Sequence, residues 1–241
     1  MRRLACAVLV AALCTALAAC GSEDDLAAVH LDVEQPGSPD PEPGLAVLRF
    51  VQAARRGDAE RMWPMLSEPT KRSIGPGMLS FAHGTALDLY DSFADFREGR
   101  VLLSRNLDGT WAVGAVTGRF ETDDGDTEPA AYAVALRREG GKWRVELAGL
   151  VIAKLRPSPA DTTGDRPEFR AEAQAGNGVE RMLLWLDGSA ARVPFERTSD
   201  FTSEIDGRPE SKIQPGEHVA VVFARTPVTA GAQAWTFDVD G

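Results

Sequence analysis

The side chains best suited to acid–base chemistry lie in one segment, residues 76–97, which is predicted to be a helix. Four of them can give or take a proton: His83, Asp88, Tyr90 and Asp91. His83 and Tyr90, seven residues apart, share one helix face, and the two aspartates, three apart, share another. The alternative is a helix with a polar outer face and one inward tyrosine. We therefore expect no catalytic residue and take His83, Asp88 and Tyr90 only as candidate pocket residues.

Other motifs that carry chemistry are absent from the sequence. It contains no G-x-S-x-G, no Ser-x-x-Lys, no phosphate-binding glycine loop and no dinucleotide fingerprint. The histidines His30, His83 and His218 lie far apart, which argues against a zinc site. The "DDGD" at residues 123–126 lacks the full calcium-loop pattern and indicates a turn. We expect no metal and no cofactor, and we favour a protein that is not an enzyme.

Cys20 has the clearest covalent chemistry. Arg2 and Arg3 precede an apolar stretch from Leu4 to Ala19, which is short for a membrane span of about 20 residues. The end of this stretch, "LAAC" at residues 17–20, resembles a bacterial lipobox. The alternatives are an ordinary secretory signal and a weak membrane anchor.

The resemblance to a lipobox implies a signal peptide over residues 1–19 and a thioether-linked diacylglycerol on Cys20, with fatty acyl chains such as palmitate. It also implies export and anchoring to the outer face of the bacterial plasma membrane. Cleavage before Cys20 removes Cys6 and Cys14, so the mature chain would keep one cysteine and form no internal disulfide.

Residues 20–43 are predicted to form an acidic, proline-rich tether. Within residues 21–43 there are seven acids, four prolines and no lysine or arginine. Low hydrophobicity with charge of one sign favours an extended chain, and proline stiffens it. The alternative is a solvated loop of the first domain. The whole chain has a formal net charge of −10, and no stretch is basic enough to indicate a nucleic-acid partner.

Residues 44–156 are predicted to form helices followed by antiparallel strands. Apolar residues recur at helical spacing in two segments: Val47, Phe50, Val51 and Ala54, then Ala59, Met62, Trp63 and Leu66. Asp58 is a natural N-cap between them, and Pro64 should bend or shorten the second helix. The third predicted helix is the segment 76–97. Period-two alternation then indicates strands over 111–115, 132–136 and 143–147, with a hairpin at "RREGGK".

Two stretches of this region, "GLAVLRFVQAARRGDAERMWPMLS" and "AYAVALRREGGKWRVELAG", resemble the NTF2-like cone fold. The resemblance implies an α+β domain with a pocket between the helices and a curved sheet. Members of that family include isomerases, dehydratases, small-molecule binders and adaptors without catalysis. They often pair through their sheets, which implies that a dimer is open to this chain.

Residues 157–167, rich in proline and poor in apolar residues, are predicted to be a linker, and residues 168–241 an all-β sandwich. The phrases "LLWLDG", "IQPGEHVAVVFAR" and "AWTFDV" resemble bacterial Ig-like modules. The expected fold is thus an α+β NTF2-like cone plus a second, smaller all-β Ig-like domain.

The expected function is that of a cell-surface lipoprotein, a non-enzymatic binding or adaptor module of the cell envelope. Its expected partners are the membrane, through the lipid on Cys20, and an envelope protein or glycan. The alternative is a small-molecule carrier, or an isomerase- or dehydratase-type enzyme, with its site in the cone pocket.

Overall fold

The computed structural model describes residues 42–122, 124–147, 150–158, 161–176, 178–193 and 195–241. The predicted signal peptide, the cysteine at position 20 and nearly all of the predicted tether lie outside these ranges. Strands hold 48% of the described residues and helices 21%, so the protein is mainly β.

The helices come first along the chain and form one layer. They are α1 (Pro43–Arg55), α2 (Ala59–Met62), the 3-10 helix η2 (Trp63–Met65), α3 (Glu68–Ile74), α4 (Met78–Ala82) and α5 (Thr85–Phe93). The N-cap at Asp58 is confirmed, because its carboxylate accepts the Arg61 N–H at 3.0 Å. Pro64 lies in η2, where the second helix ends as a 3-10 turn.

The single helix predicted over residues 76–97 is wrong. It is divided into α4 and α5 by Gly84, whose backbone angles lie outside the helical region, and the chain is already a strand at Phe96. Helix α3, which the sequence pattern did not indicate, is capped by the Ser67 hydroxyl, which accepts the Thr70 N–H at 3.2 Å.

The strands that follow form sheet A, in the order β1-β2-β3-β4, with every pair antiparallel. Their bounds are β1 (Phe96–Asn106), β2 (Trp111–Glu121), β3 (Thr127–Glu139) and β4 (Lys142–Glu146). The predicted hairpin is confirmed: Gly140 and Gly141 join β3 to β4 with φ of 56° and 79°, values that favour glycine.

The remaining strands form two further sheets. Sheet B has the order β10-β11-β7-β5, and sheet C has the order β6-β13-β12-β8-β9. Their strands are β5 (Val151–Arg156), β6 (Thr162–Thr163), β7 (Phe169–Gln174), β8 (Arg181–Leu186), β9 (Ser189–Ala191), β10 (Phe195–Arg197), β11 (Thr202–Gly207), β12 (Gly216–Arg225) and β13 (Ala230–Val239). β5, inside the predicted first domain, pairs with β7, and β6, inside the predicted linker, pairs with β13.

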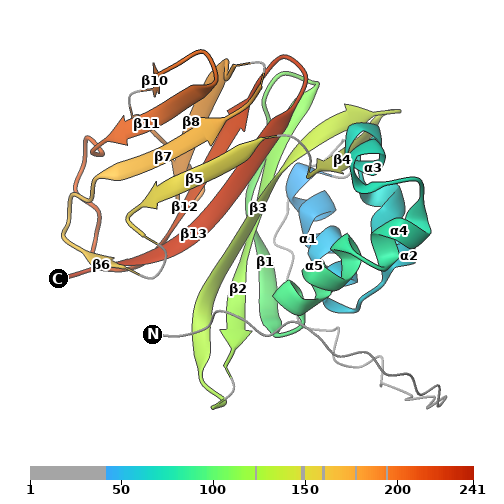
Figure 1. Ribbon diagram of the computed structural model, residues 1–241. Coiled ribbons are helices and arrows are strands. Elements are labelled where there is room, and N and C mark those ends of the chain that lie inside the picture. The colour runs from blue at the N-terminus through green and yellow to red at the C-terminus, as the bar shows by residue number, and fades with distance from the viewer. Residues whose placement is uncertain (1–41, 123, 148–149, 159–160, 177, 194) are drawn as a thin grey trace.

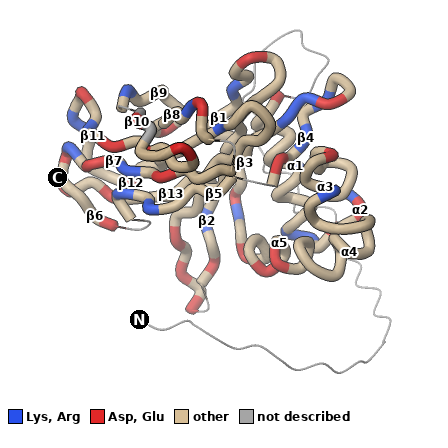
Figure 2. The backbone as a smooth tube through the Cα atoms, turned by 45° about the horizontal axis from the view of Figure 1, so that its top comes forward, with Lys and Arg blue, Asp and Glu red and all other residues tan. Residues whose placement is uncertain are grey.

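The layers stack in the order helices, sheet A, sheet C, sheet B (Figure 1). Alternate residues of each central strand face opposite neighbours. In β12, for example, Val221 and Phe223 pack towards sheet A, whereas Val222 packs towards sheet B. Sheet C is therefore buried on both faces. Figure 2 shows that acidic and basic residues are interspersed along the outer segments of all these layers.

The expected NTF2-like cone with a separate Ig-like domain is therefore wrong. The helices are short, and the sheet A face that turns away from them is covered by sheet C rather than left free. A hydrophobic core is shared across this contact, with Leu103, Trp111 and Val113 from sheet A and Trp185, Val221 and Phe223 from sheet C. The sheet face through which the resemblance left a dimer open lies inside this core.

Alanines bring the two sheets unusually close. Ala115, Ala133 and Ala135 line sheet A at the contact, and Ala230 lies on β13 opposite them. Cα atoms of β3 and β13 approach within 8 Å, whereas stacked sheets usually lie about 10 Å apart. Larger side chains, led by the two tryptophans Trp111 and Trp185, fill the wider part of the gap.

Polar contacts seal the edge of this shared core. The Arg137 guanidinium lies 4.3 Å from the Trp111 ring centroid and donates to a Glu146 carboxylate oxygen at 3.2 Å. It also donates to the Val228 carbonyl oxygen in the turn between β12 and β13. Arg225 on β12 forms an ion pair of 2.9 Å with Asp108 in the β1–β2 turn. Sheets A and C are thus joined by both packing and charge.

The first turn of α1 is wedged against sheet A. The Gly44 N–H donates to the Ser104 hydroxyl at 3.0 Å. A Cβ atom on Gly114 would lie 2.8 Å from the Pro43 carbonyl oxygen, so only glycine lets the helix approach β2 this closely. The start of the fold is therefore fixed on β1 and β2.

We predict that Ala133→Leu destabilises the whole protein by about 1–3 kcal/mol, because the close contact between sheets A and C has no room for three more carbon atoms. Urea unfolding, followed by tryptophan fluorescence and by far-ultraviolet circular dichroism, should show one transition shifted equally in both signals. Ala190→Leu, on exposed β9, is the matched control and should have little effect. Two transitions, with only one shifted, would show that the layers fold independently.

Candidate functional site

The three candidate pocket residues do not form a site. His83 ends α4 and is exposed, and Asp88 is exposed on α5. Tyr90 is 41% exposed, with its ring against Gly57 at the end of α1. The alternative of a single inward tyrosine is therefore wrong for Tyr90. The helix turns its other face inward, where Ala86 and Phe93 are buried.

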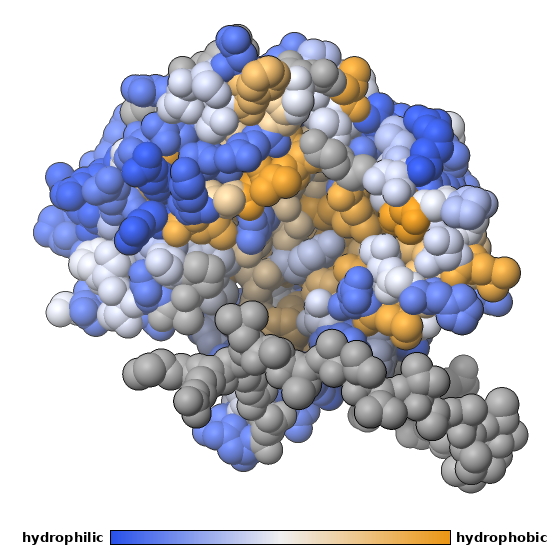
Figure 3. Space-filling view, viewed as in Figure 1, coloured by the Kyte–Doolittle hydropathy of each residue, from blue (hydrophilic) through white to orange (hydrophobic). Residues whose placement is uncertain are grey.

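An apolar hollow of about 280 Å³ does lie between α5 and sheet A. Its lining comes from α5, the start of β1 and the outer ends of β2 and β3: Leu89, Ser92, Phe93, Phe96, Phe120, Ala131 and Tyr132. In the space-filling view, apolar surface gathers over the helical side and in the hollowed centre of the face shown (Figure 3). The hollow is the kind of concavity that takes a small apolar molecule.

Aromatic rings fix the shape of the hollow. Phe93 meets Tyr132 edge-on, with ring centroids 4.8 Å apart, and Phe96 meets Phe120 edge-on at 5.6 Å. Burial raises the pKa of the Tyr132 hydroxyl, which stays protonated at neutral pH. That hydroxyl makes no hydrogen bond to any other residue in the described ranges. The hydroxyl could therefore donate a hydrogen bond to a bound ligand.

Sequence reasoning missed this lining. The alternation of Tyr132, Val134 and Leu136 was visible and put them on one face, where the structure has them. No spacing along the chain, however, connects that face with Phe93, which lies nearly forty residues earlier and on another element.

Glu146 is a buried carboxylate whose importance the sequence did not indicate. Its side chain is fully buried, and burial raises its pKa, although the Ser67 hydroxyl and Arg137 act in the opposite direction. One carboxylate oxygen bonds Arg137, and the other finds no partner among the described residues. Since Glu146 lines none of the concavities described here, we assign it to the edge of the shared core.

His218 closes a polar clasp at the end of sheet C. Its Nδ1 lies 2.7 Å from the Asp187 carboxylate, and its Nε2 lies 2.7 Å from the Gln214 carbonyl oxygen. Both partners are acceptors, so only the doubly protonated ring satisfies both contacts. Burial lowers the pKa of His218, but the hydrogen bonds to Asp187 and Gln214 outweigh it and raise the pKa overall.

Within the described ranges, no three histidine, cysteine, aspartate or glutamate side chains gather as a metal site would require. In the same part of the chain, no helix has the length and apolar character needed to cross a bilayer.

No protein-family model matches the chain, and no curated protein matches its sequence. Among solved structures, an endo-β-1,4-mannanase from Thermotoga petrophila is 13% identical, with a TM-score of 0.33 over 40% of this chain and 21% of that one. Dimeric latent PorU from Porphyromonas gingivalis is 12% identical, with a TM-score of 0.34 over 57% of this chain and 15% of that one.

Tandem immunoglobulin domains of titin are 7% identical, with a TM-score of 0.27 over 54% of this chain and 87% of that one. The chain therefore spans only 21% and 15% of the mannanase and PorU chains. Likenesses this weak carry no argument about fold or function.

We predict that the His218 clasp makes stability depend on pH. Folding raises the pKa of His218, so the protonated ring stabilises the folded protein. This contribution is fully present below the pKa of an ordinary histidine and is lost as pH rises through the pKa of the folded state. Urea unfolding should therefore give a larger free energy near about pH 6 than near about pH 9. His218→Asn should reduce the difference by about 1–2 kcal/mol, the value of a hydrogen bond to a charged group. His83→Asn, at an exposed position, is the control; an equal reduction there would exclude the clasp as the cause.

Proposed function

We propose that this protein is an exported bacterial lipoprotein held at the outer face of the plasma membrane through Cys20. The observation that carries the proposal is the order of residues at the start of the chain: two arginines, an apolar stretch, "LAAC" and an acidic segment. The described fold begins directly after that segment, at α1. A tether between lipid and fold would place the whole fold in the space outside the membrane.

We further propose that the folded part is a binding or adaptor module of the cell envelope rather than a catalyst. The proton-transferring side chains support this. His83, Asp88 and Tyr90 lie apart on an exposed surface, where water weakens the electrostatic interactions that catalysis relies on. Glu146 and His218, which are the better enclosed groups, are used in holding strands together.

We predict that the chain, produced in a bacterial host, is recovered in the membrane fraction and carries a diacylglycerol on Cys20, visible as added mass on the N-terminal peptide. Cys20→Ala should remove the added mass and block cleavage before residue 20, because the thioether needs the thiol. Cys14→Ala, within the predicted signal peptide, is the matched control and should leave both unchanged. An unmodified, cleaved wild-type chain in the medium would overturn the anchor.

The second candidate function is small-molecule binding in the hollow beneath α5. The observation in its favour is the combination of an aromatic lining with a Tyr132 hydroxyl that bonds no other described residue. An apolar ligand with one hydrogen-bonding atom fits that combination, because its apolar part would be buried against the rings and its polar atom would accept from the hydroxyl.

We predict that a small aromatic alcohol such as 2-naphthol raises the melting temperature of the wild-type chain, since a ligand that binds only the folded state stabilises it. Ser92→Phe should abolish the increase, because Ser92 lines the hollow from α5 and the new ring occupies it. Ala190→Phe, at an exposed position, controls for added apolar surface. Equal increases in both variants would show that the alcohol binds elsewhere.

A further inference from the structure

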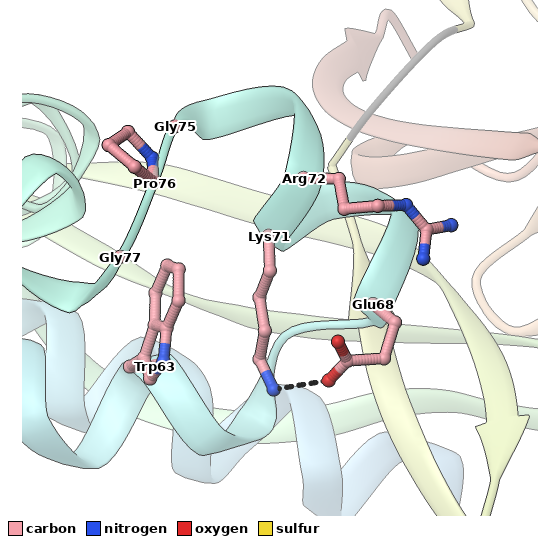
Figure 4. Close-up of a pocket in the computed structure, with 7 residues that line it drawn as sticks. All are labelled: Trp63, Glu68, Lys71, Arg72, Gly75, Pro76 and Gly77. Carbon is pink, nitrogen blue, oxygen red and sulfur yellow. Dashed lines mark hydrogen bonds and ion pairs between the residues drawn. The ribbon is translucent and has the colours of Figure 1, made fainter.

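A second concavity, of about 600 Å³, lies over η2 and α3 and shares no lining residue with the hollow beneath α5. Its walls are η2, α3 and the loop Gly75–Gly77 (Figure 4). Figure 4 shows the Trp63 indole and the Pro76 ring on one side, with Lys71 and Glu68 across from them. We call this concavity the Trp63 groove.

The aromatic wall of the groove is held in place. The Trp63 ring packs on buried Phe81, with centroids 5.6 Å apart, and Pro64 follows it in the chain with a fixed backbone angle. Trp63 is nevertheless only half-buried, whereas the other four tryptophans are at most 7% exposed. A rigid, flat and partly exposed apolar face is therefore offered to the groove.

The opposite wall is equally well anchored. The Ser67 hydroxyl caps α3, the Ser67 N–H bonds the Val145 carbonyl, and the Thr70 hydroxyl accepts the Leu147 N–H at 2.9 Å. These bonds hold the helix on β4. The backbone of α3 is therefore already ordered, which reduces the conformational entropy that would be lost when a ligand binds its charged side chains.

The charges of the groove do not cancel. Lys71 and Glu68 form an ion pair of 2.8 Å, and the Lys71 ammonium lies 5.7 Å from the Trp63 ring centroid. The adjacent Arg72 is exposed and forms no ion pair with any residue in the described ranges. Lys71, followed by Arg72 and Arg144, holds the pKa of Glu68 below its usual value. In a chain with a net charge of −10, this lining carries one cation in excess.

We propose that the Trp63 groove binds a sugar ring that carries a carboxylate. The apolar face of such a ring stacks on the indole, and its hydroxyls donate to Glu68 and accept from Lys71. The carboxylate pairs with Arg72, which supplies the excess positive charge when its exposed side chain, directed away from Trp63 in Figure 4, turns toward the groove. An apolar ligand would instead bury the Lys71–Glu68 pair without hydrogen bonds, and a polyanion would meet the Glu68 carboxylate.

This inference rests on the proposed envelope function and names the class of partner for it, a glycan with acidic sugars. The N-terminal lipid plays no part in the groove. If the sugar fails to bind while Cys20 is lipidated, the sugar proposal is wrong and the anchor stands. If the sugar binds to a chain that carries no lipid, the sugar proposal stands and the anchor is wrong.

The test uses the full chain in a sugar-free polyoxyethylene detergent, with acrylamide quenching of tryptophan fluorescence as the readout. Because four tryptophans are buried, the quenchable component reports Trp63. N-acetylmuramic acid at millimolar concentration should protect that component. Its methyl ester, which keeps the ring and loses the charge, should bind about threefold more weakly, as expected for one exposed ion pair.

Two variants separate the contributions. Arg72→Gln should lower the affinity for the acid to that for the ester, whereas Arg192→Gln, an exposed arginine next to β9, should change neither. Trp63→Leu should abolish binding measured by calorimetry; should that variant unfold, the acid–ester comparison still decides. Equal binding of acid and ester, or no protection of Trp63 by either, overturns the proposal.

Discussion

The close contact between sheets A and C is the constraint on which the rest of the structure depends. Alanines such as Ala133 and Ala135 let β3 and β13 approach within 8 Å, and the tryptophans Trp111 and Trp185 fill the space beside them. Each of the two sheets is thereby buried on both faces, so neither half has a complete core without the other. The helices and sheet B then serve as outer covers, and both concavities of the molecule described above lie on the helical cover or along its margin.

This contact explains which parts of the fold were predictable. Local signals worked: the cap at Asp58, the shortened helix at Pro64 and the Gly140–Gly141 hairpin are all present. The long helix over 76–97 failed because Gly84 interrupts a pattern that periodicity alone continues. The separation into two domains failed for a non-local reason. The run "VAVVFA" at 219–224 is apolar at every position, the pattern of a strand covered on both faces, and it implied a further layer that the two-domain interpretation lacked.

The candidate sites were harder to predict than the fold. The hollow combines elements that are distant in sequence, and the Trp63 groove, although confined to residues 63–77, depends on α3, a helix that the sequence pattern did not indicate. The hollow brings Phe93 of α5 against Tyr132 of β3, and the Trp63 groove brings η2 against the loop after α3. The choice of His83, Asp88 and Tyr90 rested on residue type and on one helix that does not exist. Residue type alone could not show that Tyr132 would face an enclosed space and Tyr90 open water.

The wedged first turn of α1 has a mechanical consequence under the proposed N-terminal anchor. If the chain is anchored through Cys20 as proposed, tension would enter the described fold at Pro43, where the neighbouring Gly44 is bonded to Ser104 and the backbone lies close against Gly114. The load therefore passes directly into β1 and β2 in the middle of the stack. Force on Pro43 cannot unfold α1 from its first residue without also displacing β1 and β2. The first turn of α1 therefore resists force together with the four layers.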